Sequence, residues 1–198
     1  MNKKYEVLDE RYLDSREDSI VRPIRALRSF GDVCAGDIGG FVESEANLSH
    51  EGNAWIYDDA EVLHDARVYG DAAIKNTARI SHNAQVFGRA QVCDAAKVDG
   101  NAKIYDNAII SENARVGFNV KVYGNAVVYG CPDIQGDAEV FGEAKIHGEG
   151  YIYGCAQIYG HAEVFENVSV YDAAVICGNA HIFGEATIRG NAFVGGHT

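Results

Sequence analysis

The sequence predicts an all-β solenoid, and three features of one short repeat support that prediction. A six-residue phrase begins at Gly52 and recurs without insertion or deletion to Gly195, so these 144 residues hold 24 phrases. The third position is small, usually Ala, and the fifth is aliphatic in every phrase. The first two positions favour Gly, Asn and Asp, which tolerate the left-handed backbone of tight turns. A fixed short period of this kind is typical of solenoids.

Each position of the phrase has an expected direction. Side chains alternate along a strand, so positions three and five share the inward face and positions four and six point outward. Positions one and two form the corner. The phrase Gly52-Asn53-Ala54-Trp55-Ile56-Tyr57 and its repeats resemble the hexapeptide-repeat superfamily. This resemblance implies a single-stranded left-handed parallel β-helix with three walls, hence about eight coils and a rod of roughly 38 Å at the strand spacing.

The chain divides into two predicted parts. Residues 1–43 lack the repeat and are expected to form a small N-terminal β cap, whereas residues 44–198 form the solenoid. An open solenoid end exposes strand edges and apolar interior, so it needs such a cap. Within the cap, residues 5–8 and 20–30 are predicted strands, joined by a polar turn around residues 14–18.

Charge and cysteine content limit the expected binding partners and the expected cellular compartment. The net charge of −12 disfavours direct binding to nucleic acid, although an acidic rod could mimic one. The five cysteines are odd in number and scattered, which argues against a disulfide framework. No stretch approaches the ~20 apolar residues of a membrane span, and no signal peptide opens the sequence. We therefore expect a cytoplasmic protein without membrane contact.

One wall is predicted to carry an outward row of aromatic residues, here called the aromatic stripe. Its members recur every eighteen residues at the sixth position: Tyr69, Phe87, Tyr105, Tyr123, Phe141 and Tyr159. A continuous apolar stripe exceeds what a soluble monomer normally leaves in contact with water. We expect it to form the interface of a homo-oligomer, a dimer or a trimer. The alternative is that the stacked rings merely cover neighbouring coils.

A second wall is predicted to carry a basic ladder. Arg79, Lys97 and Arg115 stand at the fourth position, again eighteen residues apart. Three stacked cations beside small side chains could bind a phosphate or another anionic small molecule. They could equally pair with acidic neighbours on the rod.

No organised catalytic group is evident from the repeat. The superfamily resemblance implies that an enzyme of this kind would be a coenzyme-A-dependent acyltransferase with a catalytic histidine. The only candidates singled out for that role are His64 and His82, which stack at one corner, but a base needs an orienting partner and a cleft. We expect no metal site and no cofactor, since zinc needs three or four converging ligands.

The leading functional prediction is a non-enzymatic, oligomeric solenoid that acts by binding. The imperfect first phrase at residues 44–49, with the upstream dipeptides Gly31-Asp32, Gly36-Asp37 and Gly39-Gly40, resembles bacterial and prophage hexapeptide-repeat proteins labelled acetyltransferases or polymer-forming proteins on fold grounds. That resemblance strengthens the fold prediction, whereas the binding role rests on the unbroken repeat, the aromatic stripe and the lack of an organised catalytic group. Its specific version is sequestration of an anionic signal such as a nucleotide, in a phage- or prophage-type anti-defence role. The alternatives are the acyltransferase, an acidic protein-binding inhibitor and a filament-forming scaffold.

Overall fold

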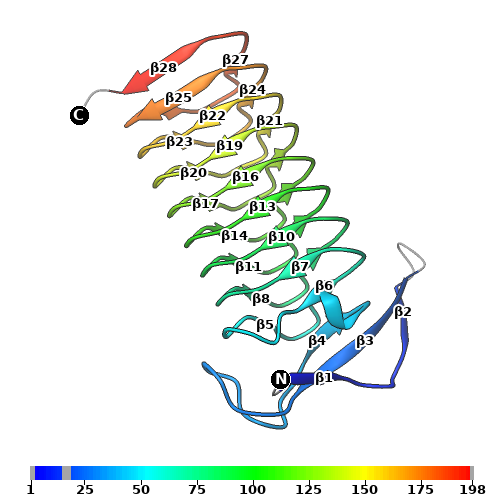
Figure 1. Cartoon of the computed structure of the whole chain (residues 1–198). Helices are drawn as coiled ribbons and strands as arrows, with labels where there is room; N and C mark the ends of the chain where they lie inside the picture. The colour runs from blue at the N-terminus through cyan, green and yellow to red at the C-terminus, as the bar shows by residue number, and fades with distance from the viewer. Residues whose placement is uncertain (1–2, 15–18, 197–198) are drawn as a thin grey trace.

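The computed structural model describes residues 3–14 and 19–196, and it shows a three-walled rod with a small β cap at its N-terminal end (Figure 1). The predicted all-β parallel solenoid is confirmed. The one helical element described is the 3₁₀ turn η1 (Glu45–Asn47), which follows the cap.

Wall A contains the cap strands and one strand from every coil. Its strands β4 and beyond pair in parallel, whereas β1, β2 and β3 pair antiparallel. The strands of wall A are β1 (Tyr5–Val7), β2 (Tyr12–Asp14), β3 (Ser19–Ala26), β4 (Ile38–Val42), β6 (Glu61–Val62), β9 (Arg79–Ile80), β12 (Lys97–Val98), β15 (Arg115–Val116), β18 (Asp133–Ile134), β21 (Tyr151–Ile152), β24 (Ser169–Val170) and β27 (Thr187–Ile188).

Walls B and C are eight-stranded parallel sheets. Wall B consists of β7 (Arg67–Val68), β10 (Gln85–Val86), β13 (Lys103–Ile104), β16 (Lys121–Val122), β19 (Glu139–Val140), β22 (Gln157–Ile158), β25 (Val175–Gly178) and β28 (Phe193–Gly196). Wall C consists of β5 (Trp55–Ile56), β8 (Ala73–Ile74), β11 (Gln91–Val92), β14 (Ile109–Ile110), β17 (Val127–Val128), β20 (Lys145–Ile146), β23 (Glu163–Val164) and β26 (His181–Ile182).

The rod has about one turn more than the strict repeat predicts. Walls B and C hold eight strands each, but the parallel run of wall A from β4 to β27 holds nine. The extra turn is built before the register begins: β4 pairs with β6, and Leu48 forms a parallel bridge to Val68. Strand β4 also pairs with β3 of the cap, so it joins the two predicted parts near the proposed boundary at residue 43.

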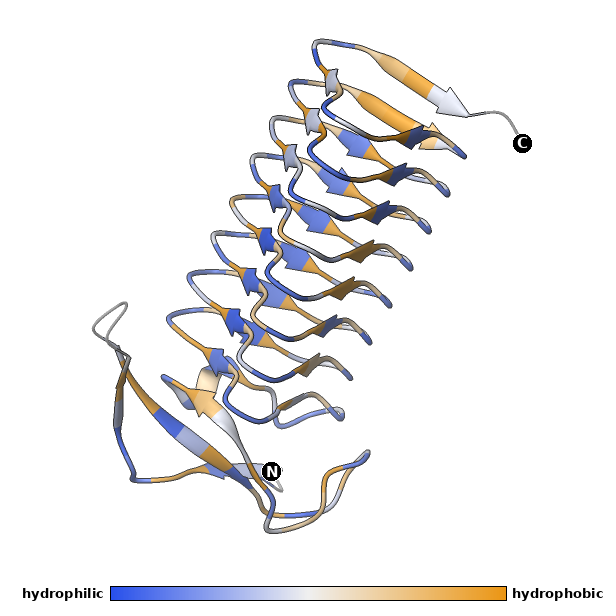
Figure 2. Ribbon diagram, turned by 180° about the vertical axis from the view of Figure 1, so that it is seen from behind, coloured by the Kyte–Doolittle hydropathy of each residue, from blue (hydrophilic) through white to orange (hydrophobic). Residues whose placement is uncertain are grey.

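Alternation along each coil builds the core. The small residue at position three and the aliphatic residue at position five are buried along the rod, as at Ala102 and Ile104, both 0% exposed. Hydrophobic and hydrophilic residues accordingly alternate around the coils from one end to the other (Figure 2). Burial weakens only in the last described coil, where Ile182, Ile188 and Val194 are half-buried.

The corners require a left-handed backbone because the chain must turn sharply between walls. Gly100 has φ +65°, and a Cβ atom there would lie 2.6 Å from the backbone N of Phe118 in the next coil. Residues other than glycine also adopt this backbone conformation at corners, as His64 and His82 do with φ of 53° and 60°.

The cap differs in detail from its prediction. Strand β1 matches the expected strand at residues 5–8, but β3 ends at Ala26 rather than reaching residue 30, and β2 and β4 were not predicted. Phe30 instead forms an isolated bridge with Val33. Of the predicted polar turn, residues 15–18 lie outside the described residues.

Side chains from the cap region satisfy the carbonyl edge of the first coils. Each coil donates backbone N–H groups to carbonyls of the next, as Ala54 N does to Gly70 O at 2.8 Å. At the cap, the Lys4 ammonium donates to Ala54 O at 2.8 Å, and the Asn47 amide donates to the carbonyls of His64 and Ala66. These side chains replace the backbone donors of a missing coil, which protects the strand edge.

Candidate functional site

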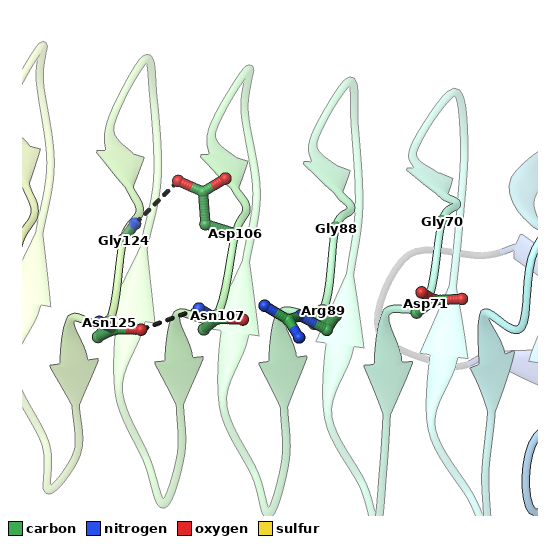
Figure 3. A pocket seen from close by; sticks show the side chains of 8 residues that line it. All are labelled: Gly70, Asp71, Gly88, Arg89, Asp106, Asn107, Gly124 and Asn125. Carbon is green, nitrogen blue, oxygen red and sulfur yellow. Dashed lines mark hydrogen bonds between the residues drawn. The ribbon is translucent and has the colours of Figure 1, made fainter.

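A groove runs along the corner between walls B and C. Its first half encloses about 580 Å³ and is lined by Gly70, Asp71, Gly88, Arg89, Asp106, Asn107, Gly124 and Asn125 (Figure 3). Three of its four first corner positions are glycine and the fourth is Asp106, whereas polar residues fill the second position in each coil.

Hydrogen bonds between coils hold this part of the groove. The Asn107 amide donates to Asn125 Oδ1 at 2.9 Å, and the backbone N–H of Gly124 donates to Asp106 Oδ2 at 3.2 Å (Figure 3). Because these polar groups already bond to one another, few of them remain to bind a ligand in this half of the groove.

The second half of the groove concentrates titratable side chains. It encloses about 520 Å³ and shares Asn125 with the first half. Its remaining lining residues are Glu143, Lys145, His161, Glu163 and His181. The parallel register of wall C stacks three of them, because β20, β23 and β26 place Lys145, Glu163 and His181 in one outward column.

Glu163 contacts two imidazoles. Its Oε2 lies 3.2 Å from Nδ1 of His181, and its Oε1 lies 3.2 Å from Nε2 of His147. The side chains of Glu163 and His147 are about three-quarters buried, whereas His181 is 58% exposed. The carboxylate and one imidazole are therefore held, and the other imidazole faces the groove.

Ring stacking orients His147. Its imidazole lies between Tyr129, at 4.6 Å between ring centroids, and Phe165, at 5.2 Å, with interplanar angles of 9° and 6°. These contacts fix the ring that shares Glu163 with His181.

A second carboxylate–imidazole pair lies at the same corner. Oε2 of Glu143 is 3.2 Å from Nδ1 of His161, and both side chains are more than 60% exposed. An imidazole whose Nδ1–H faces a carboxylate carries its lone pair on Nε2, where it can accept a proton from a substrate. In both His161 and His181, Nδ1 lies 3.2 Å from a carboxylate oxygen. Residues 3–14 and 19–196 contain no group of three potential ligands that could hold a metal ion.

The three residues of the predicted basic ladder lie in register on adjacent strands, but their side chains differ in exposure to solvent. Arg79 is 5% exposed and its Nη1 lies 2.9 Å from Glu61 Oε2. Lys97 is half-buried and Arg115 is exposed. A Cβ atom on Gly117 would lie 2.6 Å from Asp99 Oδ1, so a carboxylate fills the space beside the ladder.

The two predicted histidine candidates form a corner contact. The rings of His64 and His82 lie 5.1 Å apart, and the backbone N–H of His82 donates to His64 Nδ1 at 3.2 Å. Nδ1 of His82 lies 3.1 Å from the hydroxyl of Ser81, which is 4% exposed. Their catalytic role stays a prediction.

The aromatic stripe is a continuous stack of rings on wall B. Successive centroids lie 4.8–5.0 Å apart with interplanar angles of 3–9°. The six rings are each half-buried, since neighbouring rings cover their faces. Burial also raises the pKa of the Tyr105 and Tyr123 hydroxyls. The stacking alternative thus describes the contacts within one chain, and the predicted oligomer interface stays a prediction.

The carboxylates that orient the groove histidines were not singled out from the sequence. The signal was present as the eighteen-residue spacing of Lys145, Glu163 and His181, with His161 two residues before Glu163. Acidic residues are frequent along the sequence, so this spacing did not distinguish Glu163 and Glu143 from the others. Only the fold shows which carboxylates contact an imidazole.

The fold and its inward pattern define a hexapeptide-type β-solenoid with a polar corner groove. No family model matches the chain. The chain is 37% identical over 54 residues to the uncharacterized acetyltransferase YdcK of Escherichia coli strain K12. That match covers 27% of this chain and 17% of the relative's length. The relative's name and the solenoid both fit the hexapeptide-repeat superfamily.

The described residues include no helix that is long and apolar enough to cross a membrane.

Proposed function

We propose that this chain is an acyltransferase that works in the half of the corner groove lined by His161, Glu163 and His181. The contact between Glu163 Oε2 and His181 Nδ1, at 3.2 Å, carries the proposal. A carboxylate at Nδ1 keeps the Nε2 lone pair directed outward and stabilises the imidazolium that forms when Nε2 takes a proton.

The proposed step transfers an acyl group from a thioester to an alcohol or amine. Nε2 of His181 removes the proton of the acceptor as the acceptor's oxygen or nitrogen bonds to the thioester carbonyl carbon. The carbon–sulfur bond then breaks, and the imidazolium returns its proton to the leaving thiolate. Lys145, an exposed cation in the same column, is placed to attract the phosphate groups of an acyl-coenzyme A donor.

Two observations support this choice over a purely binding role. The relative discussed above is named an acetyltransferase, although the matched segment spans a small part of it. The groove also combines a general base, an orienting carboxylate and a neighbouring cation, which are the parts such a reaction needs.

The test is release of free coenzyme A from acetyl-coenzyme A in the presence of a panel of small alcohols and amines. His181→Gln and Glu163→Gln should each lower the rate, by about 100-fold or more for the histidine. Glu149→Gln is the matched control, because Glu149 is an exposed corner residue outside the groove. Absence of acetyl transfer, or full activity of His181→Gln, would contradict the proposal.

A second candidate is the non-enzymatic role of binding an anionic small molecule. The observation that favours it is the pair Lys97 and Arg115, which are directly opposite each other on the adjacent strands β12 and β15. Like charges at opposed positions destabilise a sheet, and an anion bound between them would relieve that repulsion. Homo-oligomerisation through the aromatic stripe is compatible with either candidate.

A further inference from the structure

The aromatic stripe ends at Tyr69 with one ring face open. Ser49 occupies in the preceding turn the place that Tyr69 occupies in its own, because Ser49 N donates to Val68 O as Tyr69 N donates to Val86 O. A serine side chain is too short to cover a phenol ring. Among the described residues, the stacked neighbour of Tyr69 is Phe87 on the opposite face.

A cavity of about 550 Å³ lies at this open end. It is lined by Ala46, Ser49, Arg67, Val68, Tyr69 and Gln85. Ala46 belongs to η1, so the 3₁₀ turn closes the side of the cavity nearest the cap. The missing ring of the stripe is therefore replaced by space rather than by another packed side chain.

The other end of the stripe is different. Cys177 follows Tyr159 in the same column and is 9% exposed. A hydrogen bond between these two side chains raises the pKa of Tyr159. Only the Tyr69 end thus combines an uncovered ring face with a cavity.

The geometry of the stripe defines what fits there. In its five successive ring pairs the ring planes are nearly parallel, and the rings are spaced by the coil repeat. A planar aromatic ring on the open face of Tyr69 would continue this offset stack, an arrangement that aromatic pairs favour.

The polar residues of the cavity indicate which substituent the bound aromatic ring carries. Arg67 is exposed, lies two residues before Tyr69, and its charge opposes the rise that burial causes in the pKa of Tyr69. A guanidinium binds carboxylate or phosphate through two parallel hydrogen bonds. Gln85 accepts from the Tyr69 hydroxyl at 3.2 Å, which leaves its amide N–H groups to donate to the same anion.

We propose that the cavity bounded by Ser49, Arg67 and Tyr69 binds a planar aromatic ring that carries a carboxylate or phosphate group. This site is separate from the proposed acyl-transfer site, because it lies at the cap end of wall B, whereas the acyl-transfer site lies farther along the rod beside Lys145, Glu163 and His181. Its ligand is selected by stacking and by one cation on a chain of net charge −12.

Calorimetric titration of the full chain tests the ligand class. Indole-3-carboxylate and phenyl phosphate are the probes; cyclohexanecarboxylate has the charge without the planar ring, and indole has the ring without the charge. We expect the aromatic anions to bind and each control to bind about tenfold more weakly or worse, given the usual strength of a charged hydrogen bond. Equal binding of cyclohexanecarboxylate, or no binding of either aromatic anion, would overturn the proposal.

Two variants test the location. Ser49→Phe supplies the missing ring and should abolish binding, whereas Ser111→Phe, which places a ring beneath Tyr129 on wall C, should not. Arg67→Gln should weaken binding about tenfold, with Lys103→Gln as its control two strands away on wall B. Arg67 is exposed, so its variant tests the site even if Ser49→Phe folds poorly. Unchanged probe binding in Arg67→Gln, or undiminished probe binding in a folded Ser49→Phe, would contradict the assignment.

Discussion

The Lys4 ammonium donates a hydrogen bond to the Ala54 carbonyl at 2.8 Å, across fifty residues of chain. Lys4 is 0% exposed and also lies 5.0 Å from the centroid of the Phe30 ring. A charged group at this depth is unusual, and it remains there because it satisfies a carbonyl that no earlier coil can reach. The cap therefore closes the rod with one buried cation.

This burial predicts a pH dependence of stability. Desolvation lowers the pKa of Lys4 from 10.5 to about 8. Between these values the unfolded chain binds more protons than the folded chain, so the free energy of unfolding should rise with pH, by ~2 kcal/mol from pH 8 to pH 10. Burial raises the pKa of Tyr5 and Tyr57, so stability should fall again above pH 10, where the unfolded tyrosines ionise first.

Urea denaturation at successive pH values measures this effect. Lys4→Met should remove the rise between pH 8 and pH 10 while keeping the fall above it. Lys3→Met is the control, because Lys3 lies on the surface with a side chain 58% exposed. A rise of the same size in Lys4→Met would show that another group causes it.

The stability cost of replacing a corner glycine should depend on how closely the next coil approaches it, and not on its backbone angle alone. Gly100 and Gly190 have nearly equal φ of +65° and +68°, but a Cβ atom would meet Phe118 backbone at the first and nothing within 4 Å at the second. Alanine at either position costs about 1–2 kcal/mol for the left-handed backbone. Gly100→Ala should cost about 1–3 kcal/mol more, as overpacking does. Equal thermal midpoints of the two variants would refute the steric argument.

The aromatic stripe predicts an oligomer that depends on wall B. Light scattering of the purified protein should give a dimer or trimer mass, and Tyr105→Lys with Tyr123→Lys should reduce it to the monomer, because two adjacent cations cannot be buried in an apolar interface. Tyr129→Lys on wall C is the control and should keep the oligomer. A monomeric wild-type protein would mean that the rings serve only to stack within one chain.

The pair Lys97 and Arg115 predicts a modest anion effect. Inorganic phosphate should raise the thermal midpoint if it binds between the two cations, by linkage of binding to folding. Arg115→Gln should lose that stabilisation, whereas Lys103→Gln on wall B should retain it. The same stabilisation in both variants would indicate a nonspecific salt effect.

Sequence periodicity predicted the coils because each inward position makes the same contact in every turn. Ala102 and Ile104 needed no knowledge of distant residues, since the neighbours of each are its own counterparts in adjacent coils. The cap has no such repetition. Strand β4 pairs with β3 on one side and with β6 on the other, and only tertiary packing selects those partners.

The candidate site was harder to predict for a related reason. Eighteen-residue spacing places Glu163 beneath His181, but it does not show that Glu163 also reaches His147, sixteen residues earlier and on the neighbouring column. It likewise predicts Arg79 in the ladder without showing its contact with Glu61. Side-chain length and rotamer decide both contacts.

The sequence determined the inward core through its six-residue period with alternating burial, and its resemblance to the hexapeptide-repeat superfamily implied the three walls and the columns of outward residues eighteen apart. Tertiary structure decided in which columns the rings stack, in which the charged side chains pair, and where a cavity remains. Rings in the aromatic stripe cover each other, Glu163 joins two histidines, and Ser49 leaves the face of Tyr69 open. These outcomes depend on the size and charge of side chains that meet across coils, and a repeat pattern places those side chains without describing their contacts.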